Sequence, residues 1–179
     1  MTKLLRTLLM TTFFIGSVQG FAQGLTPLIK AASEGDKAAV QALIKQKTNL
    51  NEKGHDNNTA LYFAISNEKT EVAKLLINSG AALENIGEDQ ESALFMAATT
   101  NNHELMKLVL KKKKSLLDVP DNEGTTPLME AAKYGSKPTI EILLKAGAKK
   151  DLKNKQGQTA LDIAKENKNE EAIQLLTKK

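Results

Sequence analysis

A short motif that recurs at a nearly constant interval is the feature that most restricts how this chain can fold. A Ser or Thr, a Leu two residues later and an Ala five residues later occur together five times, at intervals of 33, 33, 34 and 33 residues. The copies are TPLIKAA, TALYFAI, SALFMAA, TPLMEAA and TALDIAK, which begin at Thr26, Thr59, Ser92, Thr126 and Thr159. Five matches in register indicate repeated units that stack into a solenoid, because a unit this small cannot bury its apolar face alone.

The start of each motif predicts the start of a helix. The hydroxyl of the Ser or Thr can accept a backbone N–H as an N-cap, and Pro27 and Pro127 follow where a missing N–H costs nothing. Asp162, three residues after its Thr, completes a capping box. A turn and a second apolar segment come next, and in two units Gly80 or Gly147 marks the end of that segment. Each unit is therefore predicted to be a helix, a turn, a second helix and a projecting loop.

Composition agrees with a core of closely packed helices. The 179 residues include no Trp and only 4% aromatic residues, so Leu and Ala, three positions apart in every motif, must fill the core. The absence of Cys excludes disulfide bonds, thiolate metal sites and a cysteine nucleophile. The sequence predicts an all-α solenoid of five helix-turn-helix units, at about residues 24–56, 57–89, 90–123, 124–156 and 157–179.

Residues 1–22 have the order of a secretory signal peptide, with a basic start, a short apolar run and small residues. Gly20 and Ala22 fit a cut before Gln23, and Val18 with Gly20 is the competing cleavage pair. The apolar run is much shorter than the ~20 residues of a bilayer span, so a permanent transmembrane helix is the weaker interpretation. The sequence predicts export to a bacterial periplasm without a stable membrane anchor.

The charge of the mature chain argues against a nucleic-acid partner. Removal of Lys3 and Arg6 lowers the net charge from +4 to +2, with 23 basic against 21 acidic residues. Binding to phosphate backbones relies on a strong excess of basic residues, which is missing here.

The segments TPLIKAASEGD, TPLMEAAKYG, EILLKAGAKKD and KQGQTALDIAK resemble the ankyrin repeat, whose consensus includes T-P-L-H-x-A. The resemblance covers the whole mature chain, residues 23–179. Unit three departs most, with Gln90 and Lys113 where Gly is usual and one extra residue. No unit keeps the His of the consensus, and its place is taken by Ile29, Tyr62, Phe95, Met129 and Asp162.

Motifs that would carry catalysis or metal binding are incomplete. Ser66 and Lys69 match S-x-x-K, but the S-D-N and K-T-G elements of penicillin-binding enzymes do not occur, so these residues are expected in an interhelical turn. His55 is placed in an inter-unit loop and His103 at the start of the second helix of unit three, and neither has a second His at ligand spacing. No catalytic residue, metal or cofactor is predicted.

The run from Lys111 to Lys114 has two interpretations. It could bind an anionic partner such as lipid headgroups. A solvated helix C-terminus, where the helix dipole favours cations, is the preferred interpretation because Leu116, Leu117 and Val119 resume an apolar pattern directly afterwards.

In a solenoid the loops and first helices line an extended concave surface. The ankyrin resemblance implies that partners contact the loop tips, the residue before each capping Thr and the two residues after the Ala pair. Tyr134 is the strongest single candidate, since an exposed Tyr offers a large contact area at low entropy cost. The predicted partner-binding residues are His55, Asp56, Asn58, Ser66, Asn67, Glu88, Asp89, Glu91, Thr99, Thr100, Asn122, Glu123, Thr125, Lys133, Tyr134, Lys155, Gln156 and Gln158.

The resemblance to exported bacterial ankyrin proteins implies a dedicated protein partner, since some of those proteins are inhibitors or immunity factors that block a cell-wall hydrolase. The leading hypothesis is a non-catalytic periplasmic module, monomeric when free, that blocks a peptidoglycan hydrolase through its concave face and loop tips. Two alternatives remain open. One is a stabilising partner of a periplasmic stress enzyme such as a catalase, and the other is a scaffold at anionic membrane or wall polymers.

Overall fold

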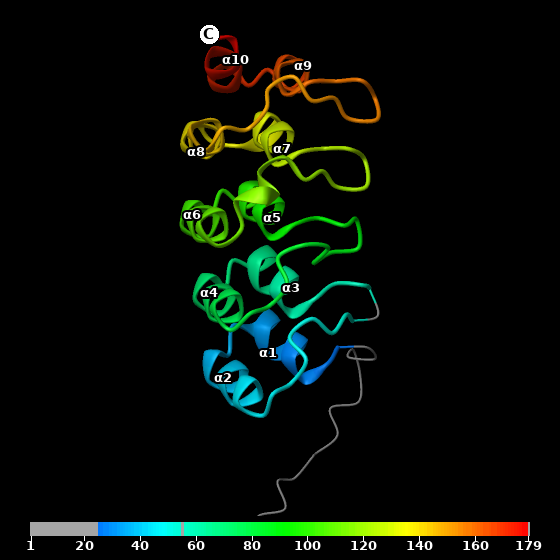
Figure 1. Cartoon of the computed structure of the whole chain (residues 1–179), viewed down its shortest axis with the longest axis vertical. Helices are drawn as coiled ribbons and strands as arrows, with labels where there is room; N and C mark the ends of the chain where they lie inside the picture. Colours follow the sequence, from blue (N-terminus) through cyan, green and yellow to red (C-terminus); the bar gives the residue numbers. More distant parts are fainter. Residues whose placement is uncertain (1–24, 55, 179) are drawn as a thin grey trace, which may run out of the picture.

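The computed structural model describes residues 25–54 and 56–178, and in this part of the chain ten α-helices stack in two columns (Figure 1). The inner column, next to the projecting loops, contains α1 (Pro27–Glu34), α3 (Ala60–Ser66), α5 (Ala93–Thr99), α7 (Pro127–Tyr134) and α9 (Ala160–Glu166). The outer column contains α2 (Lys37–Lys45), α4 (Thr70–Asn78), α6 (His103–Lys112), α8 (Lys137–Ala146) and α10 (Glu170–Thr177). Each helix packs against its partner and against the next helix in its column, which confirms the predicted five-unit all-α solenoid.

Hydroxyl caps start every inner helix, as the motif predicted. The Oγ atoms of Thr26, Thr59, Ser92, Thr126 and Thr159 each accept the N–H three residues later, at 3.1–3.3 Å. Asp162 completes the predicted capping box, with Oδ2 accepting the N–H of Thr159 at 3.0 Å. The cap therefore fixes where each unit begins, independently of its neighbours.

The core follows the inner column. Leu28, Leu61, Leu94 and Leu128 are at most 1% exposed, and the Ala residues three positions later are buried beside them. Leu161, expected in the same inner core, is only partly buried. It lies in the last unit, where no further unit of the described chain covers it.

The turns between inner and outer helices use left-handed backbone in four units, at Gly35, Glu68, Asn101 and Lys168. Unit four differs, because Gly135 has φ −70° and ψ 149°. A Cβ atom there would overlap the carbonyl oxygen of Ala131. Glycine is thus needed at this turn for close backbone approach and not for a positive φ.

The extra residue of unit three is accommodated after α6, where Lys113 ends the helix and the 3₁₀ helix η1 (Lys114–Asp118) follows. Leu116 and Leu117 of η1 are buried, which agrees with the apolar pattern after the lysine run. Lys113 Nζ lies 2.7 Å from Glu84 Oε2 of the preceding unit. One of the four lysines is therefore already paired within the protein.

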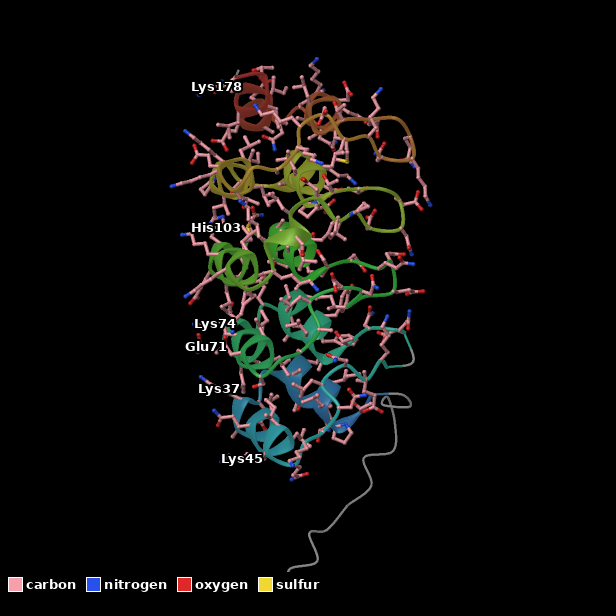
Figure 2. All side chains as sticks on the ribbon, viewed as in Figure 1. Lys37, Lys45, Glu71, Lys74, His103 and Lys178 are labelled. Carbon is pink, nitrogen blue, oxygen red and sulfur yellow. The ribbon has the colours of Figure 1, made fainter. Side chains whose placement is uncertain are left out.

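Ion pairs join the outer helices of the first three units. Lys37 Nζ lies 3.2 Å from Glu71 Oε2, and Lys74 Nζ lies 2.8 Å from Glu71 Oε1 and 2.7 Å from Glu104 Oε1. Figure 2 shows Lys37, Glu71 and Lys74 along this side of the molecule. Hydrogen bonds from Lys74 and Lys37 lower the pKa of Glu71. Because these side chains are exposed or half-exposed, the ion pairs contribute little to stability.

Candidate protein-binding face

The inner helices and the loops between units form one continuous surface, which we name the loop-side face. It consists of α1, α3, α5, α7, α9 and the loops at residues 51–54, 56–58, 84–91, 120–125 and 153–158. In Figure 1 the loops project from the same side of the stack and follow one another along it. Side chains from all units can therefore contact a single partner at once.

Hydrogen bonds between successive loops hold the tips in register. The backbone N–H of Asn122 donates to the carbonyl of Asp89 at 2.9 Å, and that of Lys155 donates to the carbonyl of Glu123 at 3.0 Å. The N–H at the equivalent place in the loop before α5, that of Glu88, donates at 2.8 Å to the side-chain Oδ1 of Asn58. Loops fixed in this way lose little conformational entropy when a partner binds.

Asn58, predicted as a partner contact, is buried and forms a hydrogen bond within the solenoid. Only 7% of it is exposed, and its side chain supplies the acceptor that a backbone carbonyl supplies between the later loops. The sequence pattern placed it correctly before the capping Thr59 but did not reveal the direction of its side chain.

Among the other predicted loop residues, His55 lies outside the described residues. The rest are either partly buried or exposed. Four side chains are partly buried, namely Glu91, Asn122, Thr125 and Gln158. The exposed loop tips are those of Asp56, Glu88, Asp89, Glu123, Lys155 and Gln156.

The predicted residues at the ends of the inner helices differ in what they can offer a partner. The hydroxyls of Thr99 and Thr100 donate to carbonyls of their own helix, at 3.1 and 3.0 Å, and are half-buried. Ser66 is exposed, whereas the amide of Asn67 donates to Ser33 Oγ at 2.9 Å. Thr99, Thr100 and Asn67 are thus already engaged inside the solenoid.

Tyr134 is the prominent apolar group of the face. It is 61% exposed, and the ammonium of the neighbouring Lys133 lies 4.6 Å from the ring centre. A cation over the ring restrains both side chains. This arrangement presents an aromatic surface at the end of α7 that a partner can cover.

Acidic residues of the loops before α3 and α5 surround Tyr62, which the prediction did not assign to the site. Burial raises the pKa of the Tyr62 hydroxyl, and the charges of Glu91, Asp56, Asp89 and Glu88 raise it further. A Cβ atom at Gly87 would meet the Tyr62 ring at 2.9 Å, so glycine lets the loop pack on this ring. Tyr62 occupies the position of the consensus His. This departure from the consensus is the sequence feature that could have identified Tyr62.

A hollow of about 310 Å³ lies between the loops and inner helices of units four and five. Glu130, Glu166 and Asn167 were not predicted, although Glu166 and Asn167 occupy the positions that follow the Ala motif in unit five. The lining residues are Glu123, Thr125, Met129, Glu130, Lys133, Asn154, Gln156, Gln158, Ile163, Glu166 and Asn167.

A second hollow, of about 320 Å³, lies between α6 and α8 and includes His103, which starts α6 as predicted (Figure 2). His103 Nε2 is 3.0 Å from Thr139 Oγ1 and 3.4 Å from Ser136 Oγ. Thr139 donates its only hydroxyl proton to Asn101 Oδ1 at 2.6 Å, so its oxygen can only accept from His103. The hydrogen-bond network therefore assigns His103 Nε2 as the donor to Thr139 Oγ1.

Within residues 25–54 and 56–178, no group of three or more His, Asp or Glu side chains could hold a metal ion. In the same residues, no helix has both the length and the apolar character needed to cross a bilayer.

Comparison with known families decides which solenoid this is. The model for ankyrin repeats matches residues 2–86 and 83–154. The chain belongs to the ankyrin-repeat family. Of the residues that replace the consensus His in this ankyrin-repeat protein, Ile29, Phe95 and Met129 are buried, and Asp162 forms the capping box.

The solved structures include 517 chains that match this ankyrin-repeat protein. One is the immunity protein in the complex of a predatory endopeptidase from Bdellovibrio bacteriovorus with its immunity protein. The similarity has a TM-score of 0.81 and 40% sequence identity, and it covers 87% of this chain and 81% of that chain. None of the curated proteins compared with the sequence matches it.

Proposed function

We propose that this ankyrin-repeat protein is a non-catalytic immunity protein of the periplasm that binds and inhibits a peptidoglycan-cleaving endopeptidase through its loop-side face. The observation that carries the proposal is the 40% identity, over 87% of the chain, to an immunity protein in complex with an endopeptidase. The fold alone would not suffice, because ankyrin repeats bind many unrelated partners.

The geometry of the loop-side face supports a role in protein binding. Its loops are joined to one another by hydrogen bonds, and Tyr134 offers an exposed aromatic anchor. A pre-ordered surface with an exposed aromatic group favours tight protein binding. The periplasmic part of the proposal is supported by the signal-peptide pattern of residues 1–22.

Titration of an endopeptidase with the mature chain tests the proposal. The enzymes are the endopeptidase that co-purifies with the protein from its host and the predatory endopeptidase of the solved relative's complex. We expect release of soluble fragments from purified peptidoglycan to fall linearly and to stop at equimolar protein. A tight complex that cleaves at the undiminished rate would contradict inhibition. A rise in enzyme abundance or activity would indicate a stabilising partner instead.

A further inference from the structure

The hollow between units four and five combines an apolar floor with polar walls. Met129 and Ile163, which are 1% and 7% exposed, come from α7 and α9 and form its apolar part. Carboxylates of Glu123, Glu130 and Glu166 stand around it against the single ammonium of Lys133. The hollow is therefore acidic at its walls and apolar at its base.

Glu123, Glu166 and Lys133 each have a close partner within the protein. Glu123 Oε1 lies 3.8 Å from Lys155 Nζ, and Glu166 Oε2 accepts from Gln158 Nε2 at 2.7 Å. The ammonium of Lys133 lies over the Tyr134 ring, 4.6 Å from its centre.

Glu130 has a side-chain hydrogen bond with Thr99 but no paired cation in the described part of the chain. Among the described residues, no ion pair within 4.0 Å includes it. Burial raises the pKa of Glu130 and the charge of Asp121 adds to the rise, while Lys133 and Thr99 oppose it. The Glu130 carboxyl group is thus partly desolvated without an ion-paired cation, so among the groups of the hollow it has the most to gain from one.

A long cationic side chain satisfies both parts of this hollow. The methylene stem of a Lys or Arg packs on apolar surface while its charged head reaches a carboxylate. An acidic side chain would face three carboxylates, and a purely apolar one would bury Glu130 further without a partner.

We propose that the hollow between units four and five receives a Lys or Arg side chain of the bound endopeptidase, whose charged head pairs with Glu130. This inference rests on the proposed function and adds the chemistry of one contact to it. It makes Glu130 a specificity-determining residue of the loop-side face, together with the apolar floor at Met129 and Ile163.

Calorimetric titration of the endopeptidase with three forms of the full mature chain tests the inference: the wild type, Glu130→Gln and Glu141→Gln. Glu141 is an exposed acid of α8 on the outer column, so its substitution removes the same charge far from the hollow. We expect Glu130→Gln to raise Kd by about 10-fold or more, as loss of a desolvated charge pair does, and Glu141→Gln to change it by less than about twofold. Thermal unfolding verifies that both variants are folded.

The outcomes separate the two proposals. If the wild type binds and inhibits but Glu130→Gln binds equally well, the inference is wrong and the proposed function stands. If the wild type does not bind, the proposed function fails and the inference fails with it.

When the wild type binds, substitution of each surface Lys and Arg of the endopeptidase by Met identifies the partner residue. The loss of affinity caused by replacing that residue must largely disappear in Glu130→Gln. If every such loss persists in Glu130→Gln, the pairing is refuted.

Discussion

The Oδ1 atom of Asn58 accepts a hydrogen bond at 2.8 Å from the backbone N–H of Glu88, thirty residues along the chain. This bond joins the loop before α3 to the loop before α5, and its acceptor is a buried side chain. The later loops are joined through backbone carbonyls, which no substitution can remove. A side-chain replacement can therefore break the bond between Asn58 and Glu88, whereas it cannot remove the backbone bonds between the later loops.

Asn58→Ala is expected to lower the free energy of unfolding by about 1 kcal/mol, because one hydrogen bond at a part-buried site is lost. Urea denaturation followed by circular dichroism measures the loss. Asn122→Ala is the control, since the same change there leaves the inter-loop bond of its backbone N–H intact. Equal effects of the two substitutions would refute a special role for Asn58.

Gln90→Gly is expected to stabilise the protein. Gln90 has φ 61°, at the loop position where Gly124 and Gly157 have φ 78° and 76°. The left-handed conformation costs a non-glycine residue about 1–2 kcal/mol, part of which is offset by the greater freedom of glycine in the unfolded chain. We expect a net gain of about 0.5–1 kcal/mol from urea denaturation.

The reciprocal change provides the matched test. Gly157→Gln introduces a side chain where a Cβ atom meets nothing within 4 Å, so only the backbone conformation opposes it. It should destabilise by a similar amount. A stabilising effect of Gly157→Gln, or none of Gln90→Gly, would show that the turn is not strained.

Thr139→Val removes a fully buried hydroxyl that contacts both His103 and Asn101. We expect a loss of about 1–3 kcal/mol in the free energy of unfolding, because the buried partners lose their hydrogen bonds. Thr177→Val removes an exposed hydroxyl at the end of α10 and should change stability by less than about 0.5 kcal/mol. Comparable losses would mean that the buried network contributes nothing specific.

Glu130→Gln is expected to raise the melting temperature at neutral pH. Burial raises the pKa of Glu130 above its ordinary value of 4.5, with Asp121 adding to the rise and Lys133 opposing it. A carboxyl group with a raised pKa stabilises the folded state below its unfolded pKa, and this contribution is lost as the pH rises through the folded value. The advantage of the variant should therefore shrink as the pH falls toward 4.5. An advantage that is independent of pH would contradict this origin.

Tyr134→Ala is expected to weaken binding of the endopeptidase by about 30-fold, which corresponds to the ~2 kcal/mol of an aromatic hot spot. Tyr134→Phe keeps the ring and should lose much less. Surface plasmon resonance measures both, and we expect the change mainly in the dissociation rate. If both variants bind as the wild type does, the partner does not cover the end of α7.

The sequence by itself determined the period, the five units and the start of every inner helix. A hydroxyl cap and an apolar pair three residues apart act within one helical turn, so neighbouring residues suffice to define them. The partial burial of Leu161 could not be predicted from neighbouring residues, because it depends on whether another unit packs on it.

Only the tertiary structure decided which polar residues form hydrogen bonds within the solenoid and which remain exposed on the loop-side face. Asn58 and Asp56 are equally polar in the sequence, yet the first is buried in an inter-loop bond and the second is exposed. Glu130 lies beside α9, and His103 meets Thr139 of the next unit. These environments come from residues about one repeat away, whose side-chain directions are fixed by packing between units and not by the local pattern.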